Sequence, residues 1–156
     1  MVVEAAIWIP IATLLLVGMV QIGRVTYTYY TLRKTLYSIG QYISSQQAAD
    51  FCNNPGDPAI TAGINFGVTG TSDNTGIPLV TGLTAAMISV TPENYDSASQ
   101  SLSEWDPSSC VTGAGGATPQ FIVVSIPNGY SLQIRIPTVP ITSVLLKPVV
   151  KVPYGG

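Results

Sequence analysis

An uncharged apolar run near the amino terminus constrains this chain more than any other feature. Residues 5–23 read AAIWIPIATLLLVGMVQIG, with Glu4 before them and Arg24 after. As a helix they cover about 28 Å at about 1.5 Å per residue, close to the ~30 Å hydrocarbon core of a bilayer. A secretory signal peptide opens with basic residues and has a shorter apolar core. We therefore expect a retained helix that can span a membrane.

Composition removes several function classes. Charged residues make up only 9% of the chain, against about 25% in a typical soluble protein. Histidine is absent and there are two cysteines, which excludes His-based acid–base catalysis, Cys–His nucleophile pairs and His- or Cys-rich zinc sites. The net charge is −2 and the six basic residues are scattered, so no patch for nucleic acid is expected. The sequence thus predicts no enzyme, no cofactor and no metal site.

The helical pattern continues well beyond the apolar run. Residues 25–51 contain no proline and alternate polar with apolar positions, so the helix is predicted to run from residue 1 to about residue 51, a length of roughly 75 Å. Apolar residues at spacings of three and four are expected to face a covering domain. These residues are Leu32, Leu36, Ile39 and Ile43.

Proline and glycine mark this helix. Pro10 lacks a backbone N–H and is expected to kink or locally open it, unless neighbours compensate. Gly18, Gly23 and Gly40 offer small surfaces for close packing.

Residues 52–156 are predicted to form a β-rich head. Asp57 resembles a helix cap, with Pro58 opening a short helix to about Phe66. The runs TAAMISVTP, FIVVSIP and YSLQIRIP read as strands, the last two joined by an Asn128-Gly129 hairpin turn. The Ser- and Gly-rich residues 96–119 are expected to be exposed, and residues 137–156 to be extended chain with room for an edge strand. The predicted fold class is α+β, a small antiparallel sheet on a long amino-terminal helical stalk.

The orientation of the chain across a membrane stays open. Arg24, Arg33 and Lys34 follow the apolar run, and the positive-inside rule would place the head in the cytoplasm. The Ser-, Thr-, Gly- and Pro-rich head and its possible disulfide suit the outside instead. That disulfide would join Cys52 to Cys110 and close a loop of about 59 residues, stabilising the fold by about 4 kcal/mol in the chain-entropy model. Two separate thiols are the alternative.

Five of the eight tyrosines lie on the long helix, at Tyr27, Tyr29, Tyr30, Tyr37 and Tyr42. At 100° per residue all but Tyr29 share an arc of about 140°, which favours packing at a boundary over an aromatic electron path. Acidic pairs at Glu93/Asp96 and Glu104/Asp106 lack the spacing of a calcium loop and are interpreted as solvated carboxylates.

The stretch WIPIATLLLVGMVQIGRVTYTYYTLRKTLYSIGQY, with an acidic residue just inside an apolar run that ends in Gly-Arg, resembles a TadE-like pilin of the type IV pilin-like family. NFGVTGTSDNTGIPLVTGLTAAMISV and YSLQIRIPTVPITSVLL are similar to later parts of that family. The resemblance covers about two thirds of the chain and leaves out the serine-rich residues 97–118.

The resemblance implies a structural subunit without catalytic activity. Subunits would wait in the inner membrane, interact with the pilus assembly machinery, and stack with other copies so that their amino-terminal helices form the core of an extracellular filament. The Glu4 carboxylate would pair with the Met1 amino group of a neighbour, because an unpaired buried carboxylate costs several kcal/mol. The alternative places Glu4 among lipid headgroups without a partner. The expected assembly residues are Met1, Glu4, Pro10, Gly18, Gly23 and Arg24.

Two other functions stay open at this level. The chain can be a single-span membrane protein whose extracytoplasmic head binds a partner, or a minor pseudopilin of the assembly machinery. Whether isolated material is filamentous without detergent separates the first of these from a pilin.

Overall fold

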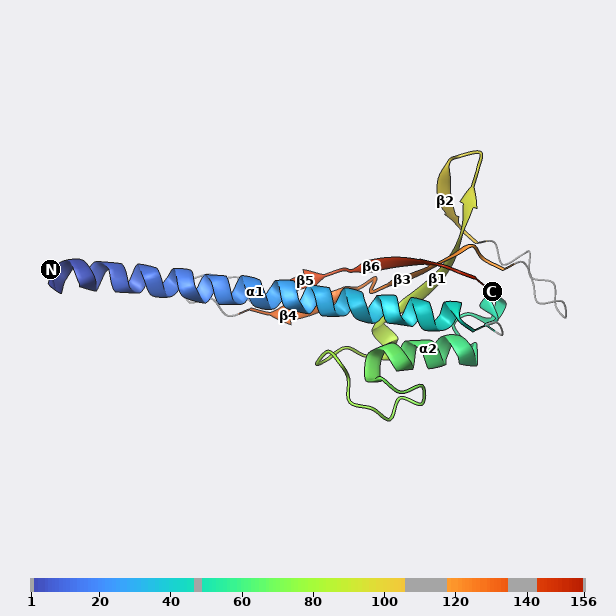
Figure 1. Ribbon diagram of the computed structural model, residues 1–156, viewed down its shortest axis with the longest axis horizontal. Helices are drawn as coiled ribbons and strands as arrows, with labels where there is room; N and C mark the ends of the chain where they lie inside the picture. Colours follow the sequence, from blue (N-terminus) through green and yellow to red (C-terminus); the bar gives the residue numbers. More distant parts are fainter. Residues whose placement is uncertain (1, 47–48, 106–117, 135–142, 156) are drawn as a thin grey trace.

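The computed structural model describes residues 2–46, 49–105, 118–134 and 143–155. Its dominant element is helix α1 (Val2–Ser44). The carboxyl half of α1 lies along the head, and the amino half projects beyond it (Figure 1). Pro10 lies inside α1 without ending it, so the expected local opening does not interrupt the helix. The predicted fold class is confirmed: a long amino-terminal helix followed by a small antiparallel sheet region.

Helix α1 ends at Ser44, earlier than the predicted end near residue 51. The Ser44 and Ser45 hydroxyls donate to the carbonyl oxygens of Gln41 and Tyr42, at 3.0 and 2.7 Å. The Ser45 N–H is shared between those same two carbonyls. Serine hydroxyls that donate to backbone carbonyls compete with the backbone N–H groups of the helix for those acceptors. The last turn therefore tightens, and the helix ends.

The capped second helix is confirmed and is longer than predicted. Helix α2 (Pro58–Thr69) follows the short 3₁₀ turn η1 (Phe51–Asn53). The buried Asp57 carboxylate accepts hydrogen bonds from two backbone N–H groups in the first turn of α2, at 2.8 and 3.0 Å. The helix ends where Gly70 adopts a left-handed φ of 79°.

Two antiparallel sheets make up the rest of the head. A 3₁₀ turn, η2 (Ala85–Met87), leads into the larger sheet, which has the order β2-β1-β3-β6. Its strands are β1 (Ser89–Asp96), β2 (Ser101–Glu104), β3 (Phe121–Ser125) and β6 (Val149–Pro153). The smaller sheet pairs β4 (Tyr130–Gln133) with β5 (Ser143–Leu146).

The predicted hairpin at Asn128-Gly129 is wrong. Strands β3 and β4 flank this turn but belong to different sheets, because β3 already pairs with β1 on one side and with β6 on the other. The Gly129 N–H donates to the Ile126 carbonyl at 2.9 Å, so Pro127 and Asn128 are the central residues of the turn. Proline second and glycine fourth suit an ordinary β-turn, which redirects the chain without a two-stranded ribbon.

Two strand predictions need correction. Strand β2 lies inside the serine-rich stretch that was placed between strands and expected to be exposed; β2 is mostly exposed, but Trp105, which follows it directly, is buried. The carboxyl-terminal stretch supplies two strands, β5 and β6, of which β6 is an edge of the larger sheet. Residues 106–117 of the serine-rich stretch, which were also expected to be exposed, lie outside the described residues.

The core lies where α1 meets the head. As predicted, Leu32, Leu36, Ile39 and Ile43 are completely buried, and this half of α1 packs on α2, β3 and β6. Three glycines permit the close approach. A Cβ on Gly40 would stand 2.6 Å from a Val152 methyl carbon, and Cβ atoms on Gly63 and Gly67 of α2 would collide with the side chains of Ile43 and Ile39.

Candidate functional site: the projecting helix and the base of the head

The amino half of α1 is apolar and almost entirely uncovered. In the described part of the chain, α1 is the one helix long and apolar enough to cross a membrane. Its most apolar 18 residues have a mean hydropathy of 2.0, and none of them is buried. Its exposed large side chains include Ile7, Trp8, Ile9, Leu15, Leu16, Met19, Val20 and Ile22. Soluble monomers rarely leave so continuous an apolar surface in water, so lipid or other protein must cover it.

The predicted assembly residues are spread along this surface. Glu4 and Pro10 lie on α1, and Met1 lies outside the described residues. Among the described residues, nothing lies within 4 Å of the position that a Cβ on Gly18 or Gly23 would take, so the described part of the head packs on neither glycine. Their open surfaces are available to another helix.

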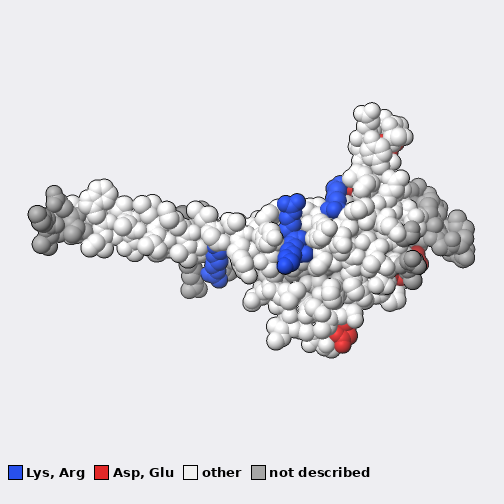
Figure 2. Space-filling view, viewed as in Figure 1, with Lys and Arg blue, Asp and Glu red and all other residues white. Residues whose placement is uncertain are grey.

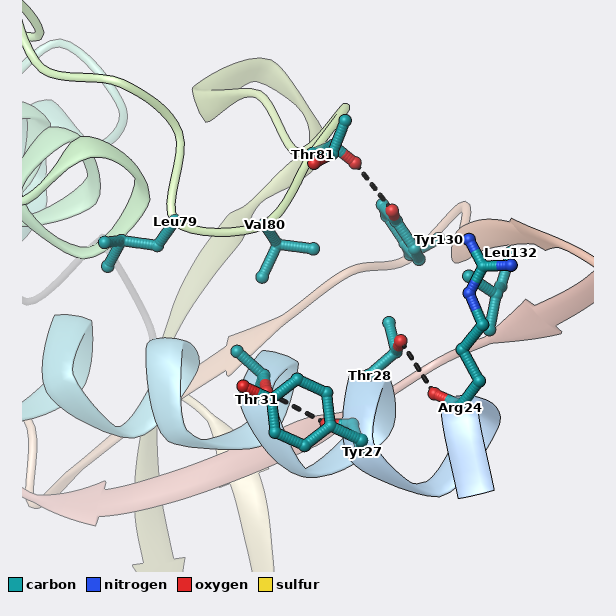
Figure 3. A pocket seen from close by; sticks show the side chains of 9 residues that line it. All are labelled: Arg24, Tyr27, Thr28, Thr31, Leu79, Val80, Thr81, Tyr130 and Leu132. Carbon is teal, nitrogen blue, oxygen red and sulfur yellow. Dashed lines mark hydrogen bonds between the residues drawn. The ribbon is translucent and has the colours of Figure 1, made fainter. Parts of the chain in front are cut away.

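Arg24, the last predicted assembly residue, lines a small hollow where α1 meets the head (Figure 3). The hollow has a volume of about 230 Å³. The Tyr130 hydroxyl donates to the Thr81 carbonyl at 2.6 Å, and the Thr28 hydroxyl donates to the Arg24 carbonyl at 2.9 Å. Small-molecule sites usually have a volume above about 300 Å³, and several free polar groups point into them. Here the volume is smaller than that and the Thr28 and Tyr130 hydroxyls already have partners, so we interpret the hollow as a packing seam.

A larger groove lies further along α1, and we call it the basic groove. It has a volume of about 640 Å³ and lies between α1 and β6. The residues that line it are Tyr30, Arg33, Lys34, Tyr37, Val149, Val150 and Lys151. It holds three of the six basic residues of the chain. The Lys151 ammonium is paired with the Glu93 carboxylate at 2.8 Å.

The basic groove was not predicted from the sequence, although part of its signal is present there. Tyr30, Arg33, Lys34 and Tyr37 are spaced by three and four along a helix, which puts them on one face. Nothing in the sequence placed Lys151 beside them, because β6 reaches α1 only through the tertiary fold.

Charge is divided along the long axis of the molecule. In Figure 2 the blue Lys and Arg atoms lie between the projecting helix and the middle of the head, while most red Asp and Glu atoms lie further from the amino terminus. On this face, basic side chains therefore gather near the base of the head and most acidic ones lie toward its far end.

The helix tyrosines are divided between packing and exposure. The Tyr42 ring stacks on Phe66 with ring centroids 5.1 Å apart, which joins α1 to α2. Tyr27 and Tyr30 are each more than two-thirds exposed, and Tyr37 is about half exposed. Tyr29 is also exposed, at 41%.

The acidic residues of the head make local contacts. Hydrogen bonds from Ser99 and from the Ala98 N–H lower the pKa of the Asp96 carboxyl, and bonds from Thr75 and Thr71 lower that of Asp73. Glu93 lies opposite Glu104 in the β1–β2 register. Asp106 lies outside the described residues, and among those described no three metal-ligating acidic, Cys or His side chains come together.

The two cysteines lie in different parts of the chain. Cys52 lies in η1 at the far end of α1, with its backbone N–H bonded to the Asp50 carboxylate at 2.9 Å. Cys110 lies outside the described residues, so the pairing of the two stays a prediction.

Fold and surface together define the class of protein. A long helix with a bare apolar amino half and a small antiparallel head is the architecture of a pilin-like α+β protein. Residues 1–40 match the family model described as TadE-like protein, which confirms the resemblance over that segment of the chain. A TadE-like segment indicates a pilus-associated protein with an apolar amino-terminal helix, anchored in a membrane or associated with a surface pilus. Comparisons with curated proteins and with solved structures gave no match.

Proposed function

We propose that this protein is a structural pilin, a subunit that polymerises through its apolar amino-terminal helix into an extracellular type IV-like or Tad-like filament. The observation that carries the proposal is the bare amino half of α1, which is strongly apolar and is left almost entirely uncovered by the described residues of the head. A helix of this kind fits a bilayer before assembly and a bundle of identical helices afterwards.

The two environments bury the apolar side chains almost equally well. Lipid tails are as apolar as leucine, so transfer from a membrane to a helix bundle gains little from the hydrophobic effect. Close packing at small residues such as Gly18 and Gly23 and the pairing of polar groups must then favour the filament. The Glu4 carboxylate paired with the Met1 amino group of a neighbour is the polar contact that we propose at the helix ends.

We further propose an extracytoplasmic head in which Cys52 and Cys110 form a disulfide. Oxidising compartments support such a bond, and it would tie residues after β2 to the end of the stalk. A low content of charged residues is compatible with a surface that is mostly packed against other copies.

Electron microscopy of material sheared from producing cells, with mass spectrometry of any fibres, tests this function. Fibres made mainly of this chain support a pilin that forms the filament itself. Recovery of the chain only in detergent, with no copy in fibres, would overturn the proposal and favour a single-span anchor with a binding head. A few copies per fibre would instead indicate a minor subunit.

A further inference from the structure

The basic groove has the residue types and the exposure of a protein-binding surface. Two tyrosine rings and Val149 form its apolar part, and each of these side chains is at least half exposed. Arg33 and Lys34 are also exposed, and the Lys151 side chain retains 47% of its accessible surface although it is paired with Glu93. Tyrosine and arginine at the centre of a hollow are the residue types that dominate binding energy at protein interfaces.

The position of the groove argues against lipid headgroups as its occupant. Arg24 marks the end of the apolar run, and Arg33 follows nine residues later. That is about 14 Å further along a helix axis, whereas the headgroup layer of one leaflet is only about 5–8 Å thick. When residues 5–23 cross a bilayer, the groove therefore stands clear of the phosphate layer.

A complementary surface exists on the same chain. Residues 93–105, which include β2 and the turn before it, contain no Lys or Arg and carry Asp96 and Glu104. They also include Glu93, whose carboxylate is already paired with Lys151 of the same chain. The turn between β1 and β2 stands away from α1 and from the rest of the sheet (Figure 1). Among the described elements, β2 makes its substantial contacts with β1 alone. Glu104 is exposed, and the four residues of the turn, 97–100, are all exposed.

We infer that the basic groove of one copy binds the acidic β1–β2 hairpin of a second copy, head to tail along the filament. This inference rests on the proposed function and adds to it the contact that sets how neighbouring heads align. The turn of the hairpin stands away from α1, which forms one wall of the groove (Figure 1), although the Glu93–Lys151 ion pair joins the base of the hairpin to the groove. A contact between two different surfaces is heterologous, and repeating it yields an open helical polymer instead of a closed dimer. Opposite charges at the contact fix its register and exclude misaligned neighbours.

A charge-swap cycle in producing cells tests the contact. Lys34→Glu and Glu104→Lys each place like charges at the interface, and each should lower the yield of sheared fibres at least about tenfold. The combination of both substitutions restores an opposite pair in reversed order and should recover most of the lost yield. Both side chains are exposed, so folding of the head, followed by protease resistance, should be unchanged in all three variants.

Lys147→Glu is the matched control, because it makes the same change of charge at an exposed lysine outside the groove. It should leave fibre yield within about twofold of wild type and should not rescue Glu104→Lys. Recovery by the Lys147 variant, or failure of the Lys34 and Glu104 pair to rescue each other, would overturn the inference.

A zero-length carbodiimide cross-link between Lys34 and Glu104 gives a second readout. It should form in fibres and be absent from detergent-solubilised monomers. Lys34→Arg keeps the charge but removes the amine, so its fibres should assemble and lose the link. Wild-type fibres without this link would overturn the head-to-tail contact and leave the pilin function standing, whereas absence of wild-type fibres would overturn the function itself. If Lys34→Glu leaves fibres intact and weakens only the retention of the chain in anionic membranes, the groove faces lipid and the inference is wrong.

Discussion

At the scale of single residues, the close packing of α1 against α2 depends on two glycines of α2 that were not predicted as packing positions from the sequence. Gly63 and Gly67 lie one turn apart on α2 and receive the side chains of Ile43 and Ile39. Both glycines are buried, so α1 and α2 can lie closer together than larger residues would allow. Only the contact between the two helices makes these positions sensitive to size.

Gly67→Ala should destabilise the head by about 1–3 kcal/mol. Its added methyl group collides with Ile39 and with the Thr35 carbonyl region, and this overpacking outweighs the gain of about 1 kcal/mol in helix propensity. Chemical unfolding in detergent, followed by protease resistance, measures the change. Gly18→Ala is the control, because none of the described side chains would meet the added methyl group there and only the propensity gain applies. Equal stability of the two variants would contradict the packing argument.

The environment of Tyr154 predicts how the stability of the head changes at alkaline pH. Its hydroxyl donates to the Gln46 carbonyl at 3.1 Å, and its ring meets Phe51 edge to face. Burial, and secondly the Asp57 charge, raise the Tyr154 pKa above its ordinary value of 10.0. The folded state therefore holds this proton more tightly than the unfolded chain does. The resulting stability is fully present below pH 10 and is lost as pH rises through the raised pKa.

Tyr154→Phe should cost about 1 kcal/mol at neutral pH through the lost hydrogen bond. Because phenylalanine does not ionise, the variant should lose less stability than wild type above pH 10, and the difference between them should shrink. Thermal unfolding at pH 8 and at alkaline pH measures both effects. Tyr95→Phe at an exposed position is the control. Parallel loss in wild type and the Tyr154 variant would contradict the assignment.

At the scale of elements, local sequence signals predicted where helices begin and how they are capped better than they predicted which strands pair. The Asp57 cap and the proline that follows it predicted where α2 begins, because both act within one turn of helix. The turn at Pro127 and Asn128 was recognised as a turn, but its strands were paired wrongly. Pairing depends on which edges of β3 are already occupied, and those edges are filled by strands distant in the sequence.

Asp57→Ala should destabilise the head by about 1 kcal/mol, within a range of roughly 0.5–2, because two backbone N–H groups lose their acceptor. Asp57→Asn retains an acceptor oxygen and should cost less. Unfolding by denaturant ranks the two variants. If the asparagine variant is as unstable as the alanine variant, the carboxylate charge matters more than the cap.

At the scale of the whole molecule, the two halves of α1 have separate roles. Residues 6–24 are largely exposed, whereas Leu32 to Ile43 supply one wall of the core. A chain that starts at Val25 should therefore fold to within about 0.5 kcal/mol of the full-length head, remain in solution without detergent, and form no fibres. Circular dichroism and gel filtration check this.

A chain that starts at Tyr37 is the matched control for that truncation. It lacks the buried Leu32 and Leu36, each worth about 2–5 kcal/mol, and should not fold. An unfolded Val25 chain would mean that the projecting half contributes to the head after all.

Glu4→Ala should block fibre formation while leaving the subunit in the membrane. The substitution removes the carboxylate that we propose pairs with a neighbour's amino terminus, and it leaves the apolar run intact. Fractionation and electron microscopy of producing cells measure the two effects separately. Asp73→Ala, on an exposed loop of the head, is the control. Normal fibres from Glu4→Ala cells would remove the charge pair from the mechanism.

The sequence by itself determined the features that depend on neighbours along the chain. These are the long helix, its apolar amino half, the buried stripe from Leu32 to Ile43, the cap of α2 and the TadE-like segment. Periodicity and capping act over one or two helical turns, so they can be recognised from the order of residues along the chain. The division of strands between two sheets, the fit of Gly63 and Gly67 against α1, and the meeting of Lys151 with Arg33 and Lys34 were decided only by the tertiary structure. Each of these joins residues far apart in sequence, and whether such residues meet depends on which surfaces the rest of the fold leaves free.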